Sequence, residues 1–165
     1  MKWVYELEAD FTWPSGLPGD RDWAFQDRTG VTRLIVTTDG SITVTKGYAW
    51  DGCTPKLCVF DIQVGVPDGV VDFRTRKPKT YYASLVHDAL YQFVPDGLPL
   101  TRAQADRCFL RLMAESGFAP RWIYYVAVRL FGDLFRRAGR RIRKTKGVRV
   151  EWRPPQGPPK ATQPS

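Results

Sequence analysis

The fold is decided by two short stretches, YASLVHDALY at residues 82–91 and TRAQADRCF at residues 101–109. The first holds His87, the one histidine of the chain, followed at once by Asp88, and the second holds Asp106. Apolar residues recur in both at spacings of three and four, which predicts two amphipathic helices that face each other. Because a polar group on an apolar helix face is costly unless it is paired, we expect His87 to contact Asp106.

Start and stop signals set the limits of three helices. The first is expected to begin near Tyr81 and to end before Pro95. Thr101 opens the second, and with Gln104 it fits a capping box, in which both side chains satisfy free backbone donors. Pro120 suits the first turn of a third helix.

The N-terminal part has the alternation and turn residues of strands. Residues 3–13 alternate loosely between apolar and polar side chains, which predicts one strand with a buried face. Residues 31–36 and 41–45 are β-branched runs on either side of an Asp-Gly pair, which is a strong hairpin signal. Residues 59–64 and 69–73 could pair as a further hairpin.

Together these elements predict an α+β fold in a single domain, residues 1–145. A small antiparallel sheet is expected within residues 1–75 and three helices within residues 80–145. Residues 146–165 are basic and rich in Pro and Gly, so we expect a tail without a fold of its own.

The charge of the chain is concentrated near its C-terminus. The net charge is +8, but residues 121–153 hold eleven Lys or Arg against two acids and the remainder sums to −1. Such a local excess favours an acidic partner, whether protein, lipid headgroups or nucleic acid. The expected partner-binding residues are Arg136, Arg137, Arg140, Arg141 and Arg143.

The cysteines and the apolar runs exclude several classes of protein. Cys53, Cys58 and Cys108 are odd in number and sparse, so the chain is not a disulfide scaffold. Their spacing does not match a familiar zinc site. We see no signal peptide and no run of the ~18 apolar residues that a membrane span needs, which favours a soluble protein.

The pairing of His87 with Asp106 has a chemical reading and a structural one. An acceptor on one ring nitrogen fixes the tautomer of a histidine and stabilises its cation, so that His87 could take a proton from water. Asp88 could then hold a hard cation such as Ca²⁺ with backbone carbonyls and Asp51, and the cation would stabilise an oxyanion. Alternatively the pair only locks two helices together.

Four motifs occur in order between residues 30 and 132: YxxDGxTP at 48–55, VHDxLY at 86–91, RxxADxxFxxxM at 102–113 and YxAVRxFG at 125–132. On these motifs the chain resembles a family of short phage and prophage proteins known as domain of unknown function 1353. The resemblance implies a phage context, with a location in the virion or in the cytoplasm of the infected host.

A narrower resemblance concerns His87-Asp88-x-x-Tyr91 and the later Asp106, which are similar to the core of secreted and viral phospholipases A2. The resemblance implies that His87 is the base, Asp88 the calcium ligand and Asp106 the residue that orients the histidine, with Tyr91 supporting the hydrogen bonds. The loop expected near the site contains Gly52, Thr54 and Pro55.

Two functions therefore stay open. One is a phage-encoded hydrolase that acts on an ester or amide of the cell envelope, with or without Ca²⁺. The other is a non-enzymatic virion or assembly protein (of the tail, the connector or the capsid) whose basic helix and tail bind other phage structural proteins. The sequence names neither a substrate nor an oligomeric state.

Overall fold

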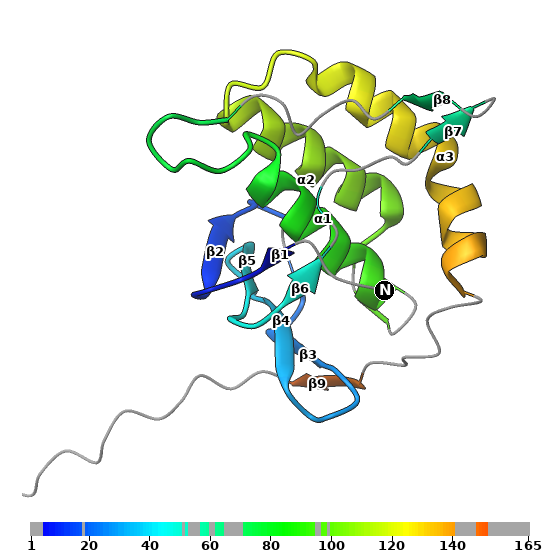
Figure 1. Ribbon diagram of the computed structural model, residues 1–165. Helices are drawn as coiled ribbons and strands as arrows, with labels where there is room; N and C mark the ends of the chain where they lie inside the picture. Colours follow the sequence, from blue (N-terminus) through cyan, green and yellow to red (C-terminus); the bar gives the residue numbers. More distant parts are fainter. Residues whose placement is uncertain are drawn as a thin grey trace, which may run out of the picture.

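The computed structural model describes residues 5–17, 19–50, 52, 57–59, 62–64, 71–94, 97–98, 100–140 and 148–151, with the backbone alone for 57–64 where described, for 131–140 and for 148. Strands come first and three helices follow, which confirms the predicted α+β class. The helices stack on one side of an antiparallel sheet (Figure 1).

The main sheet has five antiparallel strands in the order β2-β5-β4-β3-β9. They are β2 (Phe11–Pro14), β3 (Trp23–Gln26), β4 (Thr32–Val36), β5 (Ser41–Val44) and β9 (Val148–Glu151). The predicted hairpin is confirmed, since Leu34 of β4 lies opposite Val44 of β5. Its turn needs a glycine at Gly40, where φ is 81° and an added Cβ would lie 2.9 Å from the backbone of Leu17.

Two small sheets differ from the predicted arrangement. The single strand expected over residues 3–13 is two strands, β1 (Tyr5–Glu6), which pairs with β6 (Ala49–Trp50), and β2 in the main sheet. The chain divides there because Leu7 leaves β1 to exchange backbone hydrogen bonds with Gly47 and Tyr48.

The second hairpin, for which residues 59–64 and 69–73 were the candidate strands, forms between other residues. β7 (Leu57–Val59) pairs with β8 (Ile62–Val64), so residues 59–64 belong to two strands rather than to one. Only two residues separate these strands, which is a common hairpin connection. Residues 65–70, which connect the two candidate strands, lie outside the described residues.

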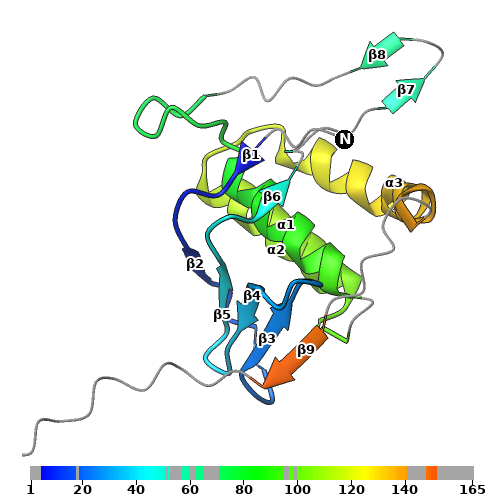
Figure 2. The same ribbon diagram turned by 60° about the horizontal axis from the view of Figure 1, so that its bottom comes forward.

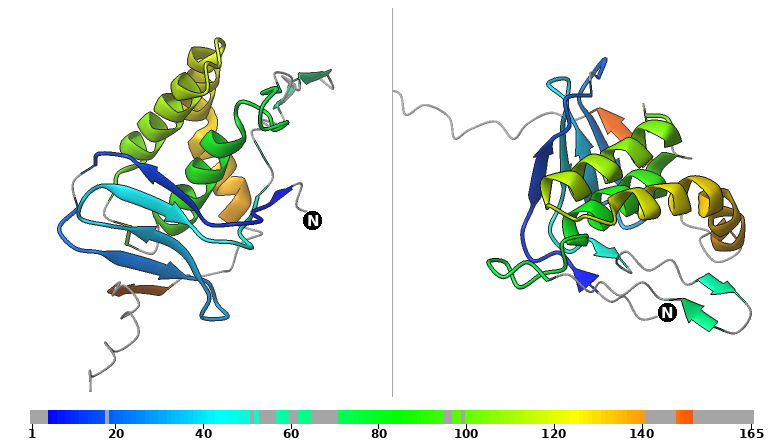
Figure 3. Two further views of the ribbon diagram at one scale, coloured as in Figure 1. Left: turned by 90° about the vertical axis from the view of Figure 1, so that its left-hand side faces the viewer. Right: turned by 90° about the horizontal axis from the view of Figure 1, so that it is seen from above.

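The helices are α1 (Tyr81–Phe93), α2 (Arg102–Glu115) and α3 (Arg121–Arg140). α1 packs against β4 and β5 on one side and against α2 on the other, and α3 packs against α2 (Figure 2). The predicted capping box is present, since the Thr101 hydroxyl accepts from the backbone of Gln104 and the Gln104 side chain accepts from the backbone of Thr101. All three helices lie on the same side of the main sheet (Figure 3).

The core lies between that face and α1. Phe25 of β3 and Phe93 of α1 are fully buried, with ring centroids 5.5 Å apart. Trp13 of β2 donates a 2.8 Å hydrogen bond from Nε1 to Glu115 at the end of α2. Sheet and helices are thus joined by both apolar and polar contacts.

The predicted tail is not wholly without structure. Val148–Glu151 forms β9, an edge strand that pairs antiparallel with β3. Arg149 holds it in place, because its guanidinium stacks 4.2 Å from the Trp23 ring and donates to the Gly97 carbonyl at 2.8 Å. The domain therefore extends past residue 145, and the remainder of the expected tail lies outside the described residues.

Candidate active site

His87 lies on the face of α1 that meets α2. It is 8% exposed, and its ring packs 4.2 Å from Tyr91 and 4.8 Å from Phe109, measured between centroids. Tyr91 is one helical turn further along α1, and Phe109 comes from the apolar stripe of α2. The helical spacing of both stretches thus encloses the imidazole in aromatic rings.

Asp106 joins all three helices. The predicted contact is confirmed, with Asp106 Oδ1 3.1 Å from His87 Nε2. The same oxygen accepts a 2.5 Å hydrogen bond from the Tyr91 hydroxyl, and Oδ2 accepts from Arg129 Nη1 at 3.0 Å. With 1% of its surface exposed, the carboxylate takes three donors in place of water, as a buried charge requires.

The electrostatics of the pair favour charge on both partners. Burial alone would raise the pKa of Asp106, but hydrogen bonds from His87, Tyr91 and Arg129 outweigh it and lower that pKa. Burial likewise opposes the His87 cation, yet the carboxylates of Asp106 and Asp88 raise the histidine pKa. Burial beside Asp106 also raises the pKa of Tyr91, which stays a hydrogen-bond donor.

An ionised carboxylate can only accept, so the Nε2–H of His87 donates to Asp106. In the neutral imidazole the lone pair is then on Nδ1. This nitrogen lies 3.9 Å from Asp88 Oδ1, and the Asp88 side chain is 33% exposed. The tautomer therefore directs the basic nitrogen of His87 toward the one carboxylate of the group that solvent reaches.

The segment from Tyr48 to Trp50 contacts the face of α1 that carries Asp88. The Tyr48 hydroxyl donates to Gln92 at 3.0 Å, and Trp50 Nε1 donates to the Ser84 hydroxyl at 3.2 Å. Ser84, Asp88 and Gln92 follow one another at steps of four residues, so they share a face. Asp88 thus lies between the two points at which β6 and the residues before it touch α1.

The proposed cation ligands are only partly described. Asp51, Thr54 and Pro55 lie outside the described residues, while Gly52 has φ 75°, in the left-handed region that favours glycine. Among the residues that are described, no three His, Cys, Asp or Glu side chains form a metal-binding group. The described residues thus leave Asp88 as the sole predicted cation ligand with a known position.

The predicted basic surface lies beyond the site. Positions 136, 137 and 140 belong to the last turns of α3, where the backbone is described, and 141 and 143 lie outside the described residues.

Arg129 is the site residue that sequence reasoning missed. The predicted site residues do not include it, whereas its guanidinium donates to Asp106. Its side chain is 46% exposed, so it spans the distance from the buried carboxylate to the surface. A signal was present, because Arg129 follows two apolar residues within the fourth motif quoted above, YxAVRxFG.

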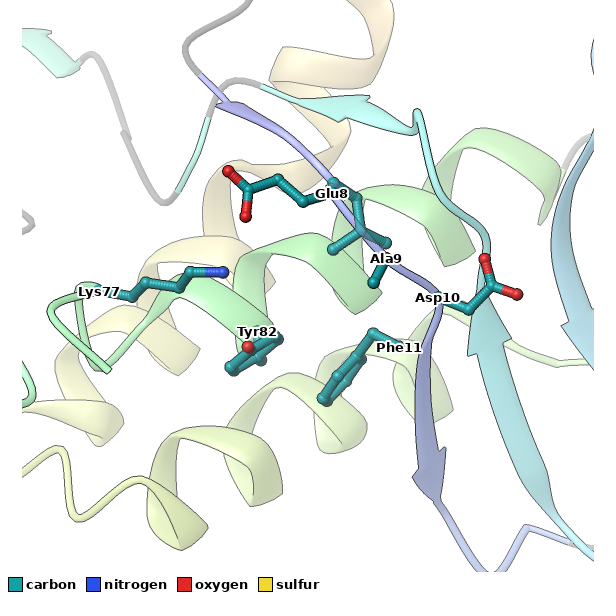
Figure 4. A pocket seen from close by; sticks show the side chains of 7 residues that line it. Glu8, Ala9, Asp10, Phe11, Lys77 and Tyr82 are labelled. Atoms are coloured by element: carbon teal, nitrogen blue, oxygen red, sulfur yellow. The ribbon is translucent and has the colours of Figure 1, made fainter. Parts of the chain in front are cut away.

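Two further features of the described residues do not belong to this site. Cys108 is buried, unpaired with another cysteine, and burial raises the pKa of its thiol to about 11, so it is no nucleophile at neutral pH. A shallow hollow of about 130 Å³ lies between the β1–β2 connection and α1. Figure 4 shows Tyr82 and Phe11 side by side at its base and Lys77 reaching toward Glu8.

The comparisons with known proteins give a family and no function. A model of the family described as "Protein of unknown function (DUF1353)" matches residues 33–128, more than half of the chain. The match spans β4 through most of the first half of α3, and so includes His87, Asp88 and Asp106. No curated protein and no solved structure matches the chain. No helix among the described residues has the length and apolar character to cross a membrane.

Proposed function

Since the chain belongs to the DUF1353 family, whose function is unknown, we propose from its side chains that it is a hydrolase with His87 as the general base. The observation that supports this best is the tautomer. Asp106 accepts the Nε2–H of His87, so in the neutral imidazole, which forms above the His87 pKa, the lone pair lies on Nδ1, 3.9 Å from the partly exposed Asp88.

The proposed step is the addition of water to an ester or amide carbonyl. The 3.9 Å separation of Nδ1 and Asp88 Oδ1 would let one water beside them form hydrogen bonds of about 2.8 Å to both. His87 takes a proton from this water as its oxygen bonds to the carbonyl carbon. The imidazolium, stabilised by Asp106, then gives that proton to the leaving alkoxide or amine.

Asp88 supplies the second part of the proposal. As a carboxylate on the solvent side of His87, it would hold a Ca²⁺ ion together with oxygens from the segment that follows Trp50. The ion would stabilise the negative charge that develops on the carbonyl oxygen. The position of Asp88 between the Tyr48 and Trp50 contacts supports this assignment.

The substrate class follows from the resemblance to phospholipases A2 and to phage proteins. We propose an ester or amide of the bacterial envelope and a phage-encoded enzyme. This assignment is supported by the hydrogen bonds that join His87 and Tyr91 of α1 to Asp106 of α2.

The test is hydrolysis of phospholipid vesicles and of a soluble ester by purified protein, with and without Ca²⁺. We expect His87→Ala and Asp106→Asn each to lose a factor of about 10²–10⁴ in rate, and Asp88→Asn to lose the response to Ca²⁺. Asp27→Asn is the matched control, since Asp27 pairs with Arg33 at 2.8 Å in the sheet. Equal rates for wild type and His87→Ala would contradict the proposal.

A second candidate function rests on the burial of the same group. Asp106 accepts from α1 and α3 while belonging to α2, which is what a structural clamp of a virion or assembly protein needs. On this alternative the His87 and Asp106 variants unfold more readily, and no substrate is turned over by the wild type.

A further inference from the structure

The outer face of α3 is apolar and exposed. Trp122, Ile123, Val126 and Leu130 are 57%, 68%, 49% and 68% exposed. At 100° per residue these four positions fall within one sector of about 100°, and we refer to them as the α3 stripe. Buried Tyr124 lies on the opposite side of the helix. Large exposed apolar side chains grouped in this way mark a surface that interacts with a protein, a membrane or a ligand.

The charge on α3 narrows the choice of partner. Residues 121–140 contain five arginines and one aspartate, a net charge of +4. On the helical wheel, positions 133, 137 and 140 fall in the same sector as the α3 stripe, about one to three turns beyond Leu130, and the first is an aspartate while the other two are arginines. One face thus begins with apolar residues and ends at basic positions.

We propose that the α3 stripe docks on an anionic phospholipid surface, with the helix lying in the interface. A strongly amphipathic helix with low overall hydrophobicity, Trp on the apolar face and arginines beside it is the kind that binds membrane surfaces. Apolar side chains would enter the boundary of the acyl chains while the arginines meet lipid phosphates.

Other occupants fit less well. A second copy of the chain would bring one +4 helix against another, which like-charge repulsion disfavours. Nucleic acid is bound by polar and cationic surfaces, and the described half of the face is apolar. The helix lies on the outside of the helix stack, away from the sheet, where a flat surface can reach it (Figures 1 and 2).

This inference stands apart from the proposed hydrolysis, because no hydrogen bond or ring contact among the described residues joins the α3 stripe to His87, Asp88 or Asp106. The chain can therefore bind vesicles without hydrolysing a substrate, and it can hydrolyse a soluble ester without binding vesicles.

The experiment is cosedimentation of the full chain with vesicles of phosphatidylcholine, with and without phosphatidylglycerol. We expect binding that requires phosphatidylglycerol and weakens with salt. The double variant Trp122→Ser/Leu130→Ser should bind about tenfold or more weakly. The matched control is Val71→Ser/Phe73→Ser, which removes two apolar residues that are 47% and 98% exposed elsewhere, and it should bind like wild type.

Thermal unfolding monitored by circular dichroism checks that both double variants remain folded. Equal binding by the stripe variant and the wild type would overturn the proposal, as would equal binding to neutral vesicles. Light scattering tests whether a second copy of the chain covers the α3 stripe instead. A wild-type dimer that becomes a monomer in the stripe variant would assign this face to a second copy and overturn the proposal of a lipid surface.

Discussion

The α1–α2 interface and the outer face of α3 arise from the same kind of sequence and end in opposite environments. Both are helical stretches with apolar residues at steps of three and four. In the interface Leu90 and Phe109 are at most 1% exposed, whereas Leu130 of the α3 stripe is 68% exposed. Periodicity alone therefore shows which residues share a helix face, and a neighbouring element decides whether that face is covered.

The two regions also differ in how far their side chains depend on one another. Asp106 is enclosed and takes donors from His87, Tyr91 and Arg129, so each partner depends on the others. The α3 stripe has no such dependence, since its side chains face solvent. Substitutions should consequently be costly in the interface and nearly free of effect on stability in the stripe.

The largest effect is expected for Asp106→Ala. Removal of the carboxylate leaves a buried histidine and tyrosine hydroxyl without their acceptor, and breaking a buried charged group in this way costs about 3–5 kcal/mol. Leu130→Ser, at an exposed position, should change the free energy of unfolding by about 0.5 kcal/mol or less. Urea unfolding of both variants measures the difference.

If Asp106→Ala and Leu130→Ser both lowered the free energy of unfolding by a similar small amount, the side chains of the α1–α2 interface would depend on one another no more than those of the surface. Asp106→Asn separates charge from shape, because the amide keeps the size of the side chain. It should lie between wild type and Asp106→Ala.

The titration of His87 sharpens the comparison further. As the only histidine of the chain, it gives a single set of imidazole signals by NMR. Its pKa is expected above the ordinary 6.5, because Asp106 and Asp88 outweigh the effect of burial. In Asp106→Asn the negative charge is lost and burial remains, so the pKa should fall. An unchanged pKa would contradict the assigned contact.

The pKa shifts of His87 and Asp106 determine how the stability of the fold depends on pH. His87 has a higher pKa when folded than unfolded, so its contribution is complete below the unfolded pKa of 6.5 and is lost as pH rises through the folded pKa. Asp106 has a lower pKa when folded, so its contribution is present above 3.8 and is lost as pH falls through the folded pKa. Unfolding in urea across pH measures both limbs.

The capping box and the three helices could be predicted because their signals are local. Thr101 and Gln104 are three residues apart, and the pairing of His87 with Asp106 follows from two helix faces and the cost of an unpaired buried charge. The hairpin between β4 and β5 was likewise set by two short runs and an Asp-Gly turn.

Features that depend on distant residues could not be predicted. The break between β1 and β2 is set by contacts of Leu7 with Gly47 and Tyr48, far along the chain. β9 becomes ordered against β3 with the help of the stacking of Arg149 on Trp23, in a region whose composition indicates a tail. The contact of Arg129 with Asp106 depends on how α3 packs against α2. The periodicity of apolar residues does not specify that packing.

A smaller effect is expected where α2 begins. Thr101→Ala removes the hydroxyl that accepts from Gln104 and the capping box is lost, which typically costs about 1 kcal/mol. The loss is a matter of local helix stability and should leave the His87 titration as in wild type. Urea unfolding and NMR of one sample check both statements, and a shift of the His87 pKa would show that the end of α2 and Asp106 move together.

Only a modest change in stability is expected for Arg129→Met, because that guanidinium is half exposed and water screens its bond to Asp106. The effect on His87 should nevertheless be clear. With the positive charge gone, the carboxylate that faces the imidazole is less neutralised, so the His87 pKa should rise above its wild-type value. Arg33→Met is the matched control, since Arg33 pairs with Asp27 in the sheet. A His87 pKa that stays the same in Arg129→Met, or that moves equally in Arg33→Met, would mean that α3 does not influence the interface, and that the two regions compared here are independent.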